Sequence, residues 1–92
     1  MSKASYDDVV NEVKRKRSTC AELVAMLEAL GFSVRRGSSG NHHTFAHRSL
    51  AGFHGGNFDC GHGRDPVPKG PYFTRVLRIL ENYEDELRQL NK

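Results

Sequence analysis

The chain has 92 residues, a formal net charge of +3 and 37% hydrophobic residues. This length suits one small domain spanning residues 1–92 and excludes a large enclosed active-site cavity. No stretch resembles a signal peptide or approaches the ~20 apolar residues of a membrane helix, so we expect a cytoplasmic protein whose two cysteines are free thiols.

The N-terminal third predicts two helices. An apolar stripe with helical spacing follows a candidate cap at Ser5 and predicts a helix within residues 1–17. Thr19 to Glu22 matches a capping box and opens a second helix. Gly31 is expected to end that helix in a left-handed conformation, with Phe32 folding back onto it. The buried faces of the two helices are predicted to carry Tyr6, Val9, Val10, Val13, Leu23, Val24, Leu27 and Leu30.

Two strands joined by a turn are predicted next. Residues 32–36 alternate with Phe32 and Val34 toward the core, and Gly and Ser at 37–40 predict a turn. Residues 41–47 form the partner strand. If Phe45 points inward, the period of two sends its neighbours at even spacing inward and the others outward. The inward set is then His43 and His47, and the outward set is His42, Thr44 and Ala46.

The rest of the chain predicts a short strand and a long helix. Residues 57–60 are the one plausible third strand, with Phe58 and Cys60 on one face. Pro71 opens a final helix. Its predicted buried face carries Phe73, Val76, Leu77, Leu80, Tyr83, Leu87 and Leu90. The order α-α-β-β-β-α predicts an α+β fold, with a small three-stranded antiparallel sheet that has helices on one face and is open on the other.

Positive charge is concentrated in the middle of the chain. Residues 32–80 hold seven Lys or Arg against two Asp, a net charge of +5, and all five histidines. Residues 81–92 hold four acidic residues against two basic ones. A basic centre indicates either a polyanionic partner or an ordinary solvated surface, and charge alone does not separate the two.

Three segments resemble the HicA-type toxins of bacterial type II toxin–antitoxin systems. The first is the helix-to-strand passage from Leu23 to Arg36. The second is Gly40-Asn41-His42-His43-Thr44-Phe45, which is similar to the family's Gly-Ser-His-x-x-aromatic signature, with Asn41 in place of serine. The third is the basic-then-helical segment from Lys69 to Leu80. Together they span roughly residues 20–82, and residues 1–17 look like the extra N-terminal helix of a longer subgroup.

The resemblance implies a fold like that of double-stranded RNA-binding domains. It also implies an endoribonuclease that cleaves messenger RNA and a cognate HicB-type antitoxin that covers the site. Carried onto this sequence, the catalytic histidine falls on His42. Strand parity independently places this residue on the open face of the sheet.

Histidine suits this chemistry because its unperturbed pKa of about 6.5 lets it take or give a proton at neutral pH. RNA carries its own nucleophile, the 2′-hydroxyl, so cleavage needs a base, an acid and cations near the phosphate, and no metal or other cofactor. We assign His42 as the base or acid. The predicted RNA-binding residues are Arg35, Arg36, His43, Lys69 and Arg75. The second proton-transfer group stays open between His43 and His62.

Two alternatives from other classes remain. A non-catalytic RNA-binding module would use the same sheet and the same basic residues, with His42 only hydrogen-bonding. A zinc-binding module would use His54, Cys60 and His62 with His42 or His43, although no Cys-x₂-Cys pair supports it.

Overall fold

The computed structural model describes residues 5–38 and 41–90 and confirms the α+β class. The elements follow the predicted order, with the last helix divided in two. They are α1 (Tyr6–Arg15), α2 (Cys20–Ala29), β1 (Ser33–Arg36), β2 (His42–Ala46), β3 (Gly56–Asp59), α3 (Gly70–Asn82) and α4 (Glu84–Leu90). Ser39 and Gly40, in the predicted turn, lie outside the described residues.

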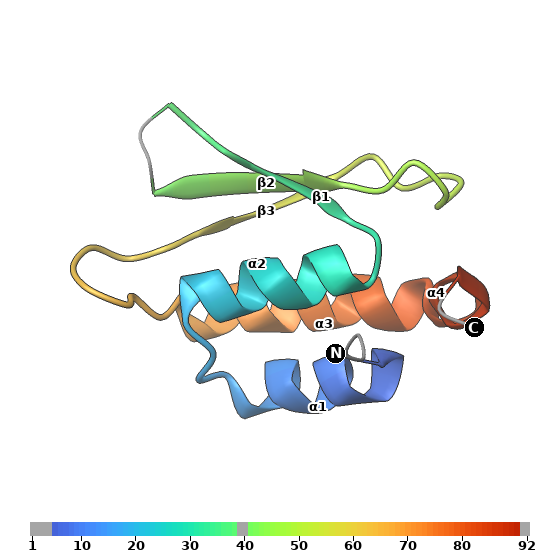
Figure 1. Cartoon of the computed structure of the whole chain (residues 1–92), viewed down its shortest axis with the longest axis horizontal. Coiled ribbons are helices and arrows are strands. Elements are labelled where there is room, and N and C mark those ends of the chain that lie inside the picture. The colour runs from blue at the N-terminus through green and yellow to red at the C-terminus, as the bar shows by residue number, and fades with distance from the viewer. Residues whose placement is uncertain (1–4, 39–40, 91–92) are drawn as a thin grey trace.

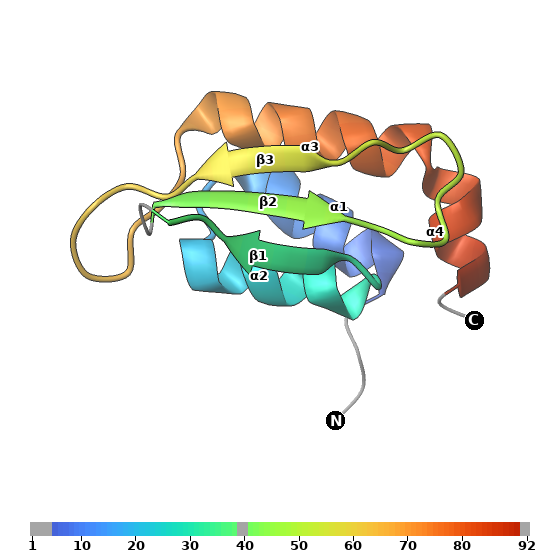
Figure 2. The ribbon, with the colours of Figure 1, turned by 90° about the horizontal axis from the view of Figure 1, so that it is seen from above.

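The three strands form one antiparallel sheet in the order β1-β2-β3. Helix α2 packs under β1 and α3 packs under β3, while α1 lies on the far side of these two helices (Figure 1). Seen from above, the sheet lies in front of the helices, and no described helix lies over its outer face (Figure 2). No helix in the described parts of the chain is long and apolar enough to cross a lipid bilayer.

The helix starts form as the sequence predicts. The side chain of Ser5 accepts a hydrogen bond from the backbone N–H of Asp8, and that of Thr19 accepts one from Glu22. In return, each carboxylate accepts a hydrogen bond from the backbone N–H of its cap residue. These reciprocal bonds satisfy donors that the first helical turn leaves unpaired. They fix the start of α2, which carries Cys20 as its first residue.

Gly31 and the buried side chain of His47 fix the end of α2. Gly31 has φ +94°, and the N–H of Phe32 bonds back to the carbonyl of Leu27 at 3.1 Å. His47 is 8% exposed, and its Nε2–H donates to the carbonyl of Leu30 at 3.1 Å. The backbone N–H of Ser49 donates to its Nδ1. His47 therefore has a structural role as a neutral, doubly bonded ring, which matches its predicted inward orientation.

This arrangement predicts a large effect of Gly31→Ala on stability. A Cβ at Gly31 would lie 2.8 Å from His47 Nε2, whereas a Cβ at Gly63, with a similar φ of +97°, would meet no atom within 4 Å. Gly63→Ala should cost about 1 kcal/mol from left-handed strain alone, and Gly31→Ala about 2–3 kcal/mol because it also displaces a buried hydrogen bond. Urea unfolding followed by circular dichroism measures both. Equal losses would show that the His47 contact adds nothing.

The core is built from the predicted faces of the helices and the inner face of the sheet. Strand parity is confirmed: Phe45 and Phe58 are buried, while Thr44 and Ala46 are exposed. The fully buried side chains are Phe58, Phe73, Leu23, Leu27, Leu30, Leu80, Leu87, Val9, Val13 and Val76.

The C-terminal helix differs from the prediction. A single helix through Leu90 was expected, but the chain turns at Tyr83 and Leu90 is 50% exposed. The turn lets α4 pack on α1, where Arg88 pairs with Asp7 at 2.7 Å and its guanidinium lies 4.7 Å from the centre of the Tyr6 ring. Leu87 stays buried in this arrangement. Helical spacing alone does not reveal where such a turn falls.

The expectation of free thiols is wrong for this structure. Cys20 and Cys60 form a disulfide with Cα atoms 5.7 Å apart. It joins the first residue of α2 to the residue directly after β3. The expectation rested on the usual redox state of a cytoplasmic protein, and that rule carries no information on whether two cysteines 40 positions apart meet in space.

Candidate functional site

The outer face of the sheet carries two rows of polar side chains. In the first row, Arg35 of β1 lies opposite Thr44 of β2, which lies opposite Asn57 of β3. In the second row, His42 of β2 lies opposite Asp59 of β3. Because side chains two residues apart share a face, these rows are neighbours on the surface that no described helix covers.

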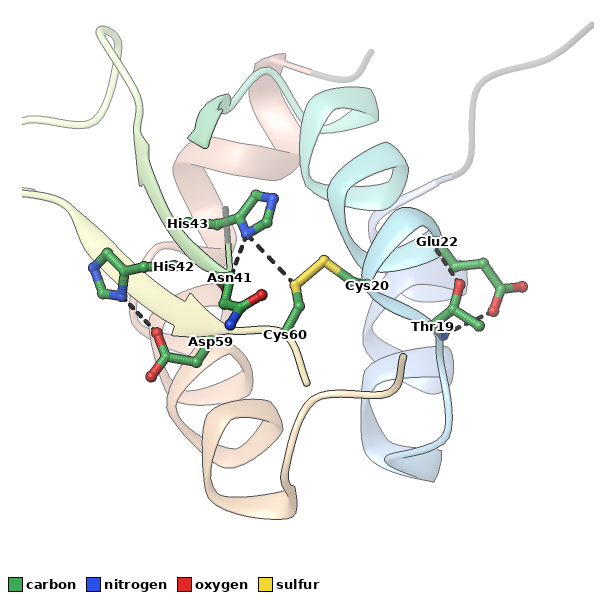
Figure 3. Close-up of a disulfide and its surroundings, with 8 residues drawn as sticks. All are labelled: Thr19, Cys20, Glu22, Asn41, His42, His43, Asp59 and Cys60. Atoms are coloured by element: carbon green, nitrogen blue, oxygen red, sulfur yellow. Dashed lines mark hydrogen bonds and ion pairs between the residues drawn. A yellow bond between two sulfur atoms is a disulfide. The ribbon is translucent and has the colours of Figure 1, made fainter. Parts of the chain in front are cut away.

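His42 and Asp59 form the closest polar contact of this face. His42 Nδ1 lies 2.5 Å from Asp59 Oδ1, and the two side chains are 45% and 50% exposed (Figure 3). An ionised carboxylate has no proton to give, so Nδ1–H is the donor. In the neutral ring this tautomer leaves Nε2 with its lone pair, which is the atom a general base needs.

Tyr72 holds the other oxygen of the same carboxylate. Its hydroxyl donates to Asp59 Oδ2 at 2.9 Å from the first turns of α3. The guanidinium of Arg75 lies 5.5 Å from the centre of the Tyr72 ring. With both oxygens hydrogen-bonded, Asp59 is fixed between the histidine and the tyrosine, so the orientation of the His42 ring is set by a bonded neighbour.

These bonds shift the pKa values of the acid and the phenol. The hydrogen bond from His42, followed by that from Tyr72, holds the pKa of Asp59 below its usual value. The bond to Asp59 raises the pKa of Tyr72. A carboxyl group whose folded-state pKa is lowered stabilises the fold above its unfolded pKa, and this contribution is lost as pH falls through the folded value. Asp59 is therefore a carboxylate at neutral pH.

A groove of about 570 Å³ lies beside this pair. Its wall includes two further groups with relevant chemistry, His62 and Lys69, together with the exposed apolar side chain of Val67. The remaining lining residues are Asn41, Cys60, Gly61 and Tyr72. The groove thus combines two imidazoles, one carboxylate and one ammonium group, which is a set suited to proton transfer beside a bound anion.

The predicted RNA-binding residues do not all lie near His42. Arg35 is exposed on the outer face, diagonally across from His42, at a spacing that a long side chain can bridge. Lys69 lines the His42 groove and Arg75 flanks Tyr72. By contrast, Arg36 and His43 line a different cavity, on the side of α2.

His43 lies on the inner side of the sheet. Its ring stacks on Phe58, with centroids 5.3 Å apart and planes within 4°, and its Nδ1 lies 3.5 Å from Cys60 Sγ. Figure 3 shows His42 and His43 leaving β2 in opposite directions. Of the two candidates for the second proton-transfer group, only His62 therefore shares the groove with His42.

The histidines and cysteine suggested for zinc do not gather as one set. His54 lines a cavity over the other end of the sheet, with Arg35 and Arg48. A different trio does meet, Cys20, His43 and Cys60, whose candidate ligand atoms all lie within 4.8 Å of one another. Cys20 was absent from the predicted zinc set because nothing in its helical context distinguishes it from a small core residue.

Sequence reasoning missed Asp59 and Tyr72 as site residues. A signal for Asp59 was present, because placing Phe58 and Cys60 on the inner face sends Asp59 outward with His42. Tyr72 gave no comparable signal. Its contact with the sheet depends on how α3 sits against the edge strand β3.

No family model, curated protein or solved structure matches this chain.

Proposed function

We propose that this protein is an endoribonuclease similar to the HicA-type toxins, which cleaves messenger RNA with His42 as its catalytic histidine. The observation that carries the proposal is the His42–Asp59 pair, placed on the uncovered face of the sheet at the mouth of a groove that also holds His62 and Lys69. This arrangement differs from that of a freely solvated histidine. The carboxylate of Asp59 orients the His42 ring through Nδ1, and the hydroxyl of Tyr72 orients that carboxylate.

The proposed reaction is an internal transesterification. His42 Nε2 removes the proton of the ribose 2′-hydroxyl, and the 2′-oxygen attacks the adjacent phosphorus. The bond from phosphorus to the 5′-oxygen breaks, and that oxygen takes a proton from His62. The products are a 2′,3′-cyclic phosphate and a free 5′-hydroxyl. No electron transfer and no metal enter this sequence.

Charge near the groove supports binding of the phosphodiester. The ammonium group of Lys69 faces the same groove and Arg35 lies diagonally across the sheet from His42. Cations placed at the scissile phosphate stabilise the negative charge that builds up in the transition state. Asp59 adds a negative charge, but both of its oxygens already accept hydrogen bonds.

The shape of the site favours a polymer over a small molecule. The outer face is an open sheet, and a second cavity lies further along it, lined by Arg35, Arg48 and His54. A single-stranded chain laid along this face can place one phosphate at His42 and further phosphates at these basic side chains. The partners proposed are thus messenger RNA in the cytoplasm and a HicB-type antitoxin protein that covers the face.

The decisive experiment is incubation of the purified protein with a long single-stranded RNA in excess chelator. We expect multiple turnovers, with fragments that carry 2′,3′-cyclic phosphate and 5′-hydroxyl ends, and no cleavage of single-stranded DNA of the same sequence because it lacks the nucleophile. Tight binding of RNA without cleavage would replace the enzyme by the non-catalytic RNA-binding module. Cleavage that requires an added metal ion would overturn the proposed chemistry.

A further inference from the structure

We propose that Cys20, His43 and Cys60 form a Zn²⁺ site when the disulfide is reduced. The three residues come from α2, β2 and the end of β3, and they meet on the inner side of the sheet (Figure 3). This site lies on the opposite face of the sheet from the His42–Asp59 pair, although Cys60 directly follows Asp59 and also lines the His42 groove. His43 was predicted to bind RNA, but its ring stacks on Phe58 on the inner side of the sheet and takes no part in the proposed cleavage, so the zinc site does not depend on that activity.

The spacing of the ligand atoms fits a tetrahedral zinc ion. One nitrogen of His43 and the two cysteine sulfurs all lie within 4.8 Å of one another. Zn–S bonds of about 2.3 Å and Zn–N bonds of about 2.0–2.1 Å place neighbouring ligand atoms roughly 3.5–3.8 Å apart. His43 Nδ1 and Cys60 Sγ are already 3.5 Å apart. The two sulfurs must separate once the bond between them is broken, and the third distance, from the His43 nitrogen to Cys20 Sγ, already lies within 4.8 Å.

The backbone around the trio is held in place independently of the disulfide. The N–H of Cys60 donates to the carbonyl of Asn41 at 2.7 Å, and that of Cys20 donates to the carbonyl of Pro66 at 2.8 Å. The His43 ring is fixed by its stacking on Phe58. Because these contacts remain after reduction, the ligands stay close together, and zinc has little ordering entropy to overcome.

The chemistry of the donors favours zinc over harder cations. Two thiolates and one imidazole are the ligands typical of zinc sites, whereas magnesium and calcium prefer oxygen. Cys20 is the first residue of α2, where the partial positive charge of a helix N-terminus favours the thiolate. Both cysteines are shielded, at 9% and 6% exposure.

A cavity of about 470 Å³ adjoins the trio and gives an ion a way in. It is lined by the three ligands and by the loop that carries His62 and Asp65. The trio supplies three protein ligands, so a water molecule from this cavity completes the tetrahedron.

The metal site forms only after the disulfide is reduced. A thiol reductant delivers two electrons and two protons to the Cys20–Cys60 bond and is itself oxidised to a disulfide. As zinc binds, both thiols release their protons to solvent. His43 Nδ1 gives up its contact with the carbonyl oxygen of Asn41, 3.4 Å away, and binds zinc, while the ring carries its proton on Nε2. Glutathione-class thiols that keep cytoplasmic cysteines reduced can supply this step.

The test is metal binding to the full chain before and after reduction with a phosphine, which becomes a phosphine oxide and leaves no competing thiol. We expect one Zn²⁺ per reduced chain, measured by competition with a chromogenic chelator, and none per oxidised chain. Cobalt should give the thiolate charge-transfer and visible bands of a tetrahedral site. A reduced wild-type protein that binds no stoichiometric zinc would overturn the proposal.

Variants identify the ligands. Cys20→Ser and His43→Gln should each weaken zinc binding by about 100-fold or more. His54→Gln removes an exposed imidazole in the loop between β2 and β3 and should leave zinc binding unchanged. Circular dichroism of each reduced variant establishes that it is folded. If folded His43→Gln binds zinc as tightly as wild type, then the proposed ligand set is wrong.

Discussion

Replacing His42 by alanine should lower the rate of RNA cleavage by about 10²–10⁴-fold, the range for removal of one acid–base group. The side chain is 45% exposed and belongs to no part of the core, so His42→Ala should stay folded and lose only the small contribution of its solvent-exposed bond to Asp59. RNA affinity should change little, because the predicted phosphate ligands Lys69 and Arg35 remain. Single-turnover cleavage and filter binding on the same RNA measure the two quantities separately.

Asp59→Asn is the companion variant, because it acts through His42 without contacting the RNA phosphate. An amide can present its N–H to Nδ1 and so favour the other tautomer, with the proton on Nε2 and no lone pair there. We expect a loss of cleavage smaller than that of His42→Ala, with RNA affinity unchanged or higher. His54→Ala is the control for loss of an imidazole: His54 lines the second cavity and takes no part in proton transfer, so at saturating RNA it should cleave at the wild-type rate. A His42→Ala protein that cuts normally would remove the basis of the proposed mechanism.

Local patterns predicted much of this fold, because local physics determines those parts. The capping boxes at Ser5 and Thr19 need only residues three positions apart, and the stop at Gly31 needs only a residue that tolerates positive φ. Side chains alternate between the two faces along a strand, and Phe45 is buried. His42, three residues before Phe45, was therefore predicted to point outward.

Features that depend on contacts distant in sequence were not predictable in the same way. The pairing of His42 with Asp59 requires the register of β2 against β3, which a glycine-rich connection of irregular length does not specify. Tyr72 reaches Asp59 only because α3 lies against the edge strand. The turn at Tyr83 depends on α4 meeting α1. In each case the sequence predicted the two secondary-structure elements separately, but it did not determine how they pack against each other.

The disulfide is the strongest example, and reduction of it should be the largest single change in stability. A cross-link that closes a loop of 40 residues restricts the unfolded chain and stabilises the fold by about 4 kcal/mol in the chain-entropy description. A domain of this size has a total of roughly 5–10 kcal/mol. Reduction should therefore lower the melting temperature by roughly 15–30 °C, measured by scanning calorimetry with and without phosphine. The Cys20→Ala, Cys60→Ala double variant is the control, and its melting temperature should not respond to the phosphine.

Added zinc tests which interaction keeps the reduced chain folded: a metal ion bound by three side chains, or the backbone hydrogen bonds of Cys20 and Cys60 alone. If Cys20, His43 and Cys60 bind Zn²⁺, the ion restores the link between α2 and the end of β3 that reduction removed, because it binds the folded chain far better than the unfolded one. Zinc at 100 times its dissociation constant should then recover about 2.7 kcal/mol, most of the loss. The double variant lacks both sulfurs and should gain nothing. A reduced wild-type protein with an unchanged melting temperature would mean that the backbone bonds of Cys20 and Cys60 hold this corner of the fold without the cross-link.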